Sequence, residues 1–362
     1  MGNSPESGAP SSPKAAGLAR RGGGMSSLPR VLGWLALAVF TVLLCVALGS
    51  VNVPLGKTAD VLLGALSGQA AGTDKDAVII LTVRLPRVLS VLLTGAALSL
   101  CGAAMQGLLR NPLADGATLG VSSGASLGAM LAILLGFRLP EIPFAGTAVL
   151  AVAFAFLSLS LVLALAFALD RSLSTGTIIL IGVIFTMFSG SLMSLLISFS
   201  GARLRSLTFW TLGSLSGTGY GEVLLLLVTL LVCGAVLYAH ARELDAFSLG
   251  EDSARYIGVP VRRAKLAVMV SVSLLIGVCV SIGGSIGFVG LVIPHITRLM
   301  TGPSHRRLLP SSMVLGGVFL MLADLLARTL LSPVEIPLGV VTSLIGAVFF
   351  VVILAGSRRR AA

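Results

Sequence analysis

Charged side chains within or beside long apolar runs are the residues of this sequence with the clearest chemical potential. Asp324 and Arg328 are four positions apart, so they can pair along one helix face. Arg84 and Arg87 stand at the start of another apolar run, and Glu335 follows Arg328 closely. Ionised groups are costly in a bilayer and usually serve a function there. The pattern indicates an acidic partner for the arginines, and the alternative is anchoring to lipid headgroups.

Enzymatic chemistry is not indicated anywhere in the sequence. Residues 55–58 (LGKT) resemble the end of a phosphate-binding loop, but Val51 stands where that loop requires glycine. The three histidines do not cluster; His295, which follows Pro294, is a weak candidate for contacting substrate. The four cysteines lie in separate apolar runs without metal-site or disulfide spacing. We therefore expect no bound cofactor or metal, and any ATP hydrolysis would belong to a partner.

The elements that must position these residues are membrane-spanning helices. Of 362 residues, 56% are hydrophobic and 11% are charged, and the mean hydropathy is +1.04. Soluble domains carry about 25% charged residues. The apolar runs approach the roughly 20 residues that a helix needs to cross the hydrocarbon. Spanning β-strands would show short alternating segments instead. The fold class is therefore all-α, as a polytopic membrane protein.

Ten apolar runs are candidate spans, and together they form one membrane domain over residues 29–357. They cover residues 31–50, 85–107, 117–136, 142–168, 177–199, 222–240, 266–283, 287–300, 310–331 and 337–355. The eighth is short and is interrupted by Pro294. Residues 1–28 are rich in Gly, Ser, Pro and Ala, which predicts a disordered cytoplasmic tail. A cleaved signal peptide is the alternative.

The basic residues predict the orientation of these spans. The net charge is +11, and lysine and arginine concentrate at the ends of apolar runs. About two-thirds of them fall on one side, which the positive-inside rule makes the cytoplasmic side. With an even number of spans, both termini lie in the cytoplasm. This distribution also explains the net charge without nucleic-acid binding.

Small residues recur every fourth position in two spans. The first strip comprises Gly116, Gly120, Gly124 and Gly128, and the second runs along residues 182–198. Such strips allow close packing of helices in lipid. Tight packing is one interpretation, and lining of a wide passage is the other; the spacing does not separate them.

The longest polar segment on the inner side is residues 241–265. Residues 248–252 contain a plausible helix cap, residues 254–258 form a candidate short helix that ends at glycine, and Pro260 stops it. Two short amphipathic helices here would suit docking of a soluble domain. The alternative is an ordinary solvated loop.

Several blocks of sequence, in order, resemble a known family. They are 84–87 (RLPR), 106–115 (QGLLRNPLAD), 119–125 (LGVSSGA), 249–258, 287–295 (GFVGLVIPH) and 323–339. On these blocks the chain resembles the iron-siderophore, haem and vitamin B12 permeases of type II ABC importers, over roughly residues 30–355. The sequence departs from the family at Gly116, Ser285 and Val348, where proline is usual, and Gly176 lacks a hydroxyl seen in some members.

The resemblance implies an assembly and its contact sites. It implies a dimer of ten-helix subunits, identical or paralogous, around a translocation path in the bacterial inner membrane, with two cytoplasmic ATPase subunits and an extracytoplasmic binding protein. Arg84, Arg87 and Arg328 match residues that dock the binding protein. Ser174, Thr175 and Gly176 match the cytoplasmic gate. Six residues within the segment 241–265 match the part of the family that couples to the ATPase. They are Leu249, Gly250, Glu251, Ala254, Arg255 and Gly258.

The function implied is import of an iron-siderophore complex, or of haem or cobalamin, by alternating access. The alternative is an ion-coupled secondary transporter, for which Asp324 is the one serious ionisable candidate. A membrane enzyme would need clustered reactive side chains, which the sequence does not show. The cargo and the identity of the second permease are left open by the sequence.

Overall fold

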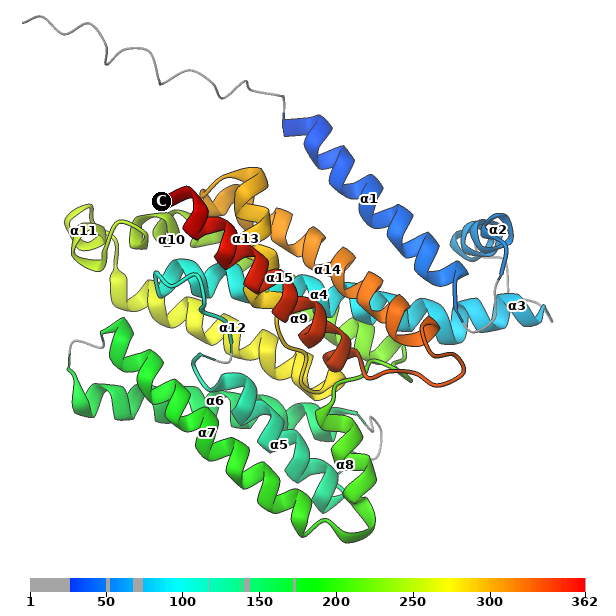
Figure 1. Ribbon diagram of the computed structural model, residues 1–362, viewed down its shortest axis with the longest axis horizontal. Coiled ribbons are helices and arrows are strands. Elements are labelled where there is room, and N and C mark those ends of the chain that lie inside the picture. The colour runs from blue at the N-terminus through cyan, green and yellow to red at the C-terminus, as the bar shows by residue number, and fades with distance from the viewer. Residues whose placement is uncertain are drawn as a thin grey trace, which may run out of the picture.

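The computed structural model describes residues 27–49, 53–67, 74–116, 118–137, 139, 144–171 and 174–361. The predicted tail, residues 1–28, lies outside the described residues apart from its last two, which begin the first helix. The described part of the chain is helical and contains no strand (Figure 1). The all-α prediction is confirmed.

Each predicted span coincides with a helix. These are α1 (Ser27–Ala47), α4 (Leu85–Leu108), α5 (Val121–Leu135), α6 (Ala145–Leu169), α7 (Thr175–Ser198), α9 (Tyr220–Ala239), α12 (Val261–Gly283), α13 (Val289–Thr301), α14 (His305–Thr329) and α15 (Leu338–Ala361). Within the described residues, six helical stretches have the length and hydropathy of a membrane span, and α1, α5, α13 and α15 contribute shorter apolar stretches.

The centre of the molecule is α4, against which α9, α12, α13 and α14 pack. In its most apolar window 78% of α4 is buried, compared with 22% of α7. Glycine makes the close crossings possible. A Cβ atom on Gly95 would lie 2.4 Å from the carbonyl oxygen of Gly316 in α14, and a Cβ on Gly102 would lie 1.8 Å from that of Gly290 in α13. The helix backbones therefore touch, as expected for small residues in lipid.

The first strip of small residues packs helices together. A Cβ on Gly128 would lie 2.3 Å from the Leu150 carbonyl oxygen of α6, and one on Gly124 would lie 2.5 Å from Ser158. Gly120 precedes α5 with φ of +71°, and Gly116 lies outside the helix. The packing interpretation therefore holds for the two glycines within α5.

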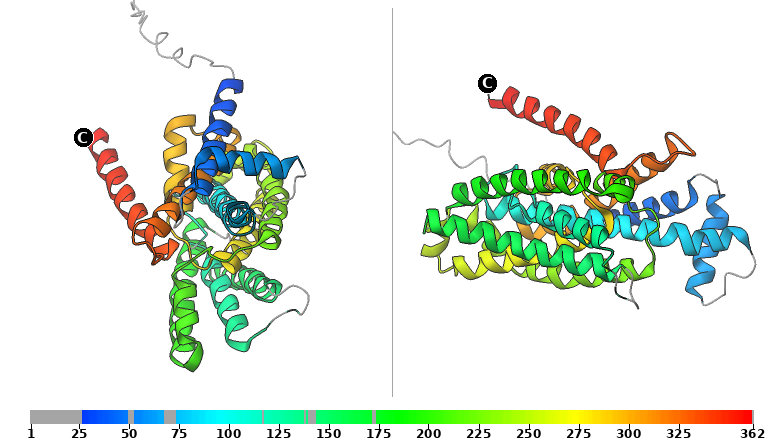
Figure 2. Two further views of the ribbon diagram at one scale, coloured as in Figure 1. Left: turned by 90° about the vertical axis from the view of Figure 1, so that its right-hand side faces the viewer. Right: turned by 90° about the horizontal axis from the view of Figure 1, so that it is seen from below.

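The second strip does not pack along its whole length. A Cβ on Gly182 would lie 2.1 Å from the Thr118 carbonyl oxygen, whereas one on Gly190 would meet nothing within 4 Å. Much of α7 is exposed in this subunit, and α15 diverges from the other helices (Figure 2).

Short helices occupy both ends of the bundle. At one end are α2 (Leu55–Leu66), α3 (Lys75–Val78), a π-helical turn η1 (Ile79–Arg84), a 3-10 turn η2 (Gly201–Arg203) and α8 (Leu204–Thr211). Residues 55–58, which resemble the end of a phosphate-binding loop, begin α2, and the Thr58 side chain is buried beneath it. The helix is amphipathic, so one face has a surface to pack on.

At the opposite end are α10 (Ala241–Phe247) and α11 (Glu251–Tyr256), as Figure 1 shows. The two short helices expected within residues 241–265 are confirmed. The N-cap residue of α11 is Gly250, within the segment 248–252 that was expected to contain a cap, but it supplies no side-chain hydrogen bond. The Ser248 hydroxyl donates to the Leu244 carbonyl of α10 instead. Gly258, with φ of +87°, ends the turn after α11.

Two of the three departures from proline lie beside closely packed glycines. The break between α12 and α13 is kept by Gly284, whose φ is +67° and whose Cβ would lie 2.3 Å from the Trp210 carbonyl oxygen. Gly116 lies against Ile276, 2.0 Å from where a Cβ would stand. Val348 lies within a continuous α15.

Pro294 leaves α13 unbroken because a side chain replaces the missing hydrogen bond. Proline has no N–H for the carbonyl four residues earlier, at Gly290. The Gln106 amide of α4 donates to the Leu291 carbonyl at 3.1 Å and to that of Gly290 at 3.4 Å. Arg298 in turn donates to the Gln106 side-chain oxygen at 3.2 Å.

Candidate functional site

Polar chemistry gathers in two places, one at each end of the bundle. At the end predicted to face outward, called the outer end, two arginines close the C-terminus of α1. The Arg84 guanidinium donates to the carbonyls of Val46 and Ala47 at 2.9 and 2.8 Å, and Arg328 donates to that of Cys45. The last carbonyls of a helix lack partners within the helix and carry partial negative charge. Arg84 and Arg328 therefore cap α1.

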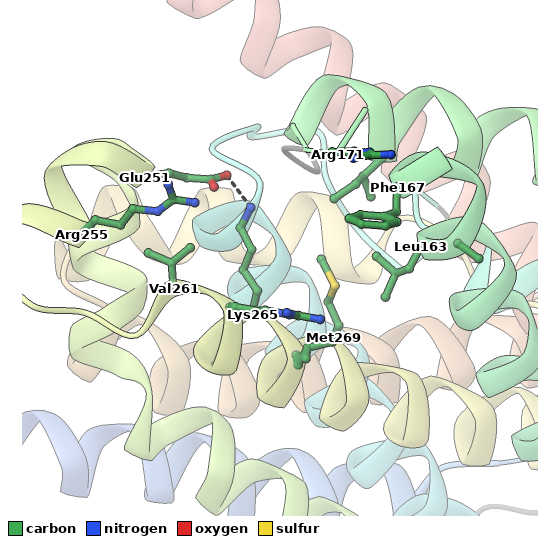
Figure 3. A pocket seen from close by; sticks show the side chains of 12 residues that line it. Leu163, Phe167, Arg171, Glu251, Arg255, Val261, Lys265 and Met269 are labelled. Atoms are coloured by element: carbon green, nitrogen blue, oxygen red, sulfur yellow. Dashed lines mark hydrogen bonds and ion pairs between the residues drawn. The ribbon is translucent and has the colours of Figure 1, made fainter. Parts of the chain in front are cut away.

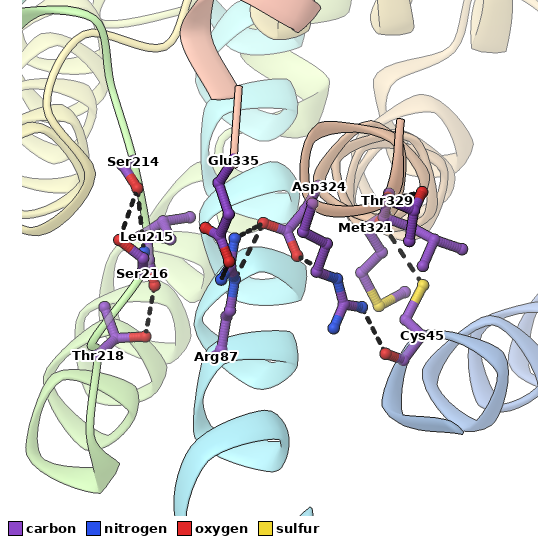
Figure 4. Close-up of polar contacts among 12 residues, drawn as sticks. Cys45, Arg87, Ser214, Leu215, Ser216, Thr218, Met321, Asp324, Thr329 and Glu335 are labelled. Atoms are coloured by element: carbon purple, nitrogen blue, oxygen red, sulfur yellow. Dashed lines mark hydrogen bonds and ion pairs between the residues drawn. The ribbon is translucent and has the colours of Figure 1, made fainter. Parts of the chain in front are cut away.

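The same end carries a chain of ion pairs (Figure 4). Arg87 Nη2 lies 2.9 Å from Asp324 Oδ1, and Arg87 Nη1 lies 2.9 Å from Glu335 Oε1. Arg328 Nε lies 3.4 Å from Asp324 Oδ2, which is the pairing that the four-residue spacing predicted. The Asp324 side chain is 2% exposed and that of Glu335 is 46% exposed. Asp324 is thus neutralised inside the protein, and Glu335 faces outward.

The structure brings the three predicted docking arginines together but does not present them as free surface charges. Arg84 and Arg328 are each 6% exposed, and the Arg87 side chain is 12% exposed. Their role in docking stays a prediction. The residues that the sequence did not show are Val46 and Ala47, because their contribution is made by backbone carbonyls.

At the opposite end, predicted to face the cytoplasm and called the inner end, Glu251 joins three helices. Its Oε1 atom accepts from Lys265 Nζ of α12 at 2.5 Å and from Thr175 Oγ1 of α7 at 3.4 Å. Lys265 is 8% exposed, so its ammonium depends on this carboxylate. A predicted coupling residue thereby contacts a predicted gate residue. Lys265 was within the predicted segment but was not singled out.

The gate segment is organised as a helix cap. The Ser174 hydroxyl accepts from the Thr177 N–H at 3.4 Å, and the Ser174 N–H donates to Asp170 Oδ2 at 3.2 Å. This arrangement fixes the start of α7. Gly176 has open space around it, since a Cβ there would meet nothing within 4 Å. The gate assignment itself stays a prediction.

A second link connects α10 to α14. Asp245 Oδ1 accepts from the His305 N–H at 2.8 Å and lies 2.6 Å from His305 Nδ1, and its Oδ2 accepts from Ser304 Oγ at 3.2 Å. The carboxylate thus caps the N-terminus of α14 from another helix. Sequence reasoning missed Asp245, because its partners lie some sixty positions away.

The rest of the predicted coupling segment forms an exposed surface. Leu249 is 72% exposed and Arg255 is exposed, whereas Ala254 is buried beneath them. Gly250 has φ of +119° and turns the chain into α11. Tyr256 and Ile257, which the sequence reasoning did not single out, are 91% and 66% exposed. Large exposed apolar side chains on a solvent-facing end are typical of a protein contact.

A cavity of about 430 Å³ lies beside this junction, between α6, α7, α11 and α12 (Figure 3). Its wall includes Arg171, Arg255 and Lys265 together with apolar side chains such as Phe167 and Met269. Among the residues that the structure describes, no group of three or more His, Cys, Asp or Glu side chains could hold a metal. The four cysteines are free and buried.

Long apolar helices, with short helices bearing an exposed apolar surface at one end, define a multi-pass membrane protein. The chain belongs to the FecCD transport family, whose model matches residues 37–356. It is 44% identical to the ABC transporter permease protein YvrB of Bacillus subtilis, over 91% of this chain and 94% of the relative. It is 40% identical to the cobalamin import system permease protein BtuC of Halobacterium salinarum, over 78% of this chain and 75% of that relative.

A solved structure of a metal-chelate type ABC transporter in an inward-facing conformation also matches. It superposes with a TM-score of 0.77 at 33% identity, covering 91% of this chain and 99% of that one. The chain is therefore the permease subunit of a type II ABC importer. Such permeases work with ATPase and substrate-binding components, and ATP hydrolysis takes place in the separate ATPase partner.

Proposed function

We propose that this permease carries ferric siderophores across the bacterial inner membrane by alternating access, as one half of a dimer with an identical or paralogous subunit. The cargo proposal is supported by the match to a metal-chelate transporter. Haem and cobalamin are the alternatives, and the cobalamin relative supports the latter. The permease binds no cofactor of its own in this proposal, and both termini lie in the cytoplasm.

The observation that carries the mechanism is the position of Glu251. ATP-driven closure of the ATPase subunits moves α10 and α11, on whose exposed surface they dock. Because Glu251 bonds to Lys265 and Thr175, that movement reaches α12 and the start of α7. The start of α7, at Ser174, Thr175 and Gly176, opens or closes the inner end of the path. Leu249, Gly250, Ala254, Arg255 and Gly258 shape the contact.

At the outer end, Arg84, Arg87 and Arg328 supply the positive field that attracts an acidic binding protein. Arg87 is the most exposed of the three, and its outward partner Glu335 is itself half exposed. An acidic side chain of the binding protein would compete with Glu335 for this guanidinium. Electrostatic complementarity of this kind acts mainly on the rate of association.

The test combines binding and uptake. The cognate binding protein is titrated with ferric siderophores, haemin and cobalamin, and the permease is reconstituted with its ATPase for uptake of whichever compound binds. We expect a ferric siderophore to bind and to accumulate only with ATP. Selective binding of cobalamin or haemin would overturn the cargo. Uptake that continues without the ATPase but stops when the proton gradient is collapsed would favour an ion-coupled transporter.

A further inference from the structure

The cavity between α6, α7, α11 and α12 has an unbalanced charge (Figure 3). Its lining includes four cations and one carboxylate. The charged lining residues are Arg171, Arg255, Arg262, Lys265 and Glu251. Glu251 is already bonded to Lys265 at 2.5 Å. Across the described part of the chain, no side-chain hydrogen bond or ion pair engages the guanidinium groups of the three arginines. They therefore face the cavity with a surplus of positive charge.

The rest of the cavity is apolar. Leu163 and Phe167 of α6 form one wall, and Leu266 and Met269 of α12 form the floor. Figure 3 shows Arg171 and Phe167 on one side and Arg255 on the other, with Lys265 reaching between them to Glu251. A ligand that fits this surface carries an anionic group at one end and hydrocarbon at the other.

The apolar surface continues along the spans. On α12, Leu266 and Val270 are each 44% exposed, and on α6, Phe167 is 52% exposed. These apolar side chains lie further along α6 and α12 than the arginines, toward the middle of the two spans. Arg171 follows the end of α6 and Arg262 lies at the start of α12, on the side that the positive-inside rule makes cytoplasmic, and Arg255 lies on α11. The cytoplasmic leaflet is the source of anionic lipid in a membrane.

We propose that this cavity is a binding site for an anionic phospholipid of the cytoplasmic leaflet. The phosphate group lies between Arg171 and Arg262, with Arg255 at the border between this cavity and the proposed ATPase contact, and an acyl chain follows the groove between α6 and α12. The three arginines come from the end of α6, from α11 and from α12, so the lipid ties the gate segment to the coupling helices. The proposal depends on the membrane placement of the chain and not on its cargo.

The experiment measures lipid directly. The full permease is purified with its ATPase partner, and native mass spectrometry follows titration with phosphatidylglycerol and with phosphatidylcholine. The variants are Arg171→Gln, Arg255→Gln, Arg262→Gln and their combination, all at exposed side chains. Because one basic residue near the surface is worth about fivefold in affinity for anionic lipid, each single change should weaken phosphatidylglycerol binding by that factor. Phosphatidylcholine binding should not change.

Arg263→Gln is the matched control, since Arg263 is an exposed neighbour on α12 that does not line the cavity. It should leave phosphatidylglycerol binding within twofold of wild type. If Arg263→Gln weakened phosphatidylglycerol binding as much as the cavity variants do, the effect would come from general surface charge, and the proposed lipid site would be wrong. Displacement of the lipid by glycerol phosphate would assign the arginines to a soluble phosphate instead. If the arginine variants lost the ATPase partner but kept lipid binding, the three arginines would form a protein contact instead.

Discussion

At the scale of single residues, the buried charges of this chain are matched by partners far away in sequence. Asp324 holds Arg87 across 237 positions, and both side chains are almost fully buried. Removing one member of such a pair commonly costs about 3–5 kcal/mol, because the other is left charged and unpaired. The exposed pair of Lys57 and Asp74 contributes little to stability by comparison, because water screens it. The outer arginines are therefore structural whatever else they do.

Glu335 offers a test of docking that leaves this structural role intact. In Glu335→Gln, Arg87 keeps Asp324 but loses its outward, half-exposed carboxylate. We expect association of the binding protein to become several-fold faster at low salt, because a rim charge acts mainly on the association rate. Stopped-flow or surface-plasmon measurements at two salt concentrations check this.

Asp60→Asn is the control for that experiment, since Asp60 is exposed on α2 and makes the same change of charge at the same end. It should have a smaller effect. Equal acceleration in both variants would show that net charge alone matters. An unchanged rate in Glu335→Gln would count against docking at Arg87.

Glu251 is the residue on which the coupling proposal turns. In Glu251→Gln, the buried ammonium of Lys265 loses its carboxylate, at a local cost of about 1–3 kcal/mol. We expect ATP hydrolysis to continue while uptake per ATP falls at least several-fold. Parallel assays of phosphate release and uptake in proteoliposomes measure the ratio. Asp252→Asn, at an exposed neighbour without a side-chain partner among the described residues, should keep the wild-type ratio. A normal ratio in Glu251→Gln refutes the link.

How much of the site the sequence can reveal depends on the separation of its partners. The pairing of Asp324 with Arg328 follows from helix periodicity and is confirmed. The contacts of Arg87 with Glu335 and of Asp245 with His305 are set by tertiary packing, which no local pattern encodes. The sequence therefore located the charged residues correctly, but it could not show that the arginines are internally paired.

At the scale of helices, hydropathy was sufficient to find the spans, because each is a long apolar run. The short helices α2 and α8 were missed, since eight to twelve residues of mixed polarity resemble a loop. Contacts between spans were predictable only as a tendency. The strip in α5 packs on α6 as expected, but the closest backbone approach, at Gly102, belongs to neither strip.

The crossing of α4 and α14 can be tested through Gly316. A Cβ there would lie 2.4 Å from the Gly95 carbonyl oxygen and 2.4 Å from the Ser99 side chain, so the two helices must separate. Overpacking of this kind costs about 1–3 kcal/mol. We expect Gly316→Ala to lower the melting temperature of the detergent-purified subunit by several degrees, measured by intrinsic fluorescence. Gly33→Ala, with nothing within 4 Å, should not lower it; equal melting temperatures for the two variants would contradict the close crossing.

At the scale of the whole molecule, the fold has two chemically distinct ends. One end presents α10 and α11 with their exposed apolar residues, and the other presents α2 and α3 (Figure 1). The exposed apolar faces of α7 and α15 are too extensive for water. In our proposal, lipid hydrocarbon and the second permease subunit cover these faces.

The opposite placement of the two ends is the premise of every proposal made for this chain, and single cysteines can test it. The native cysteines are 1–3% exposed, so the wild-type chain supplies a low background. Ser67, after α2, and Ser253, in α11, are both exposed. A membrane-impermeant maleimide should label Ser67→Cys in intact spheroplasts and Ser253→Cys only after permeabilisation. If both were labelled from outside, α11 could not reach a cytoplasmic ATPase, and the link through Glu251 would have nothing to transmit.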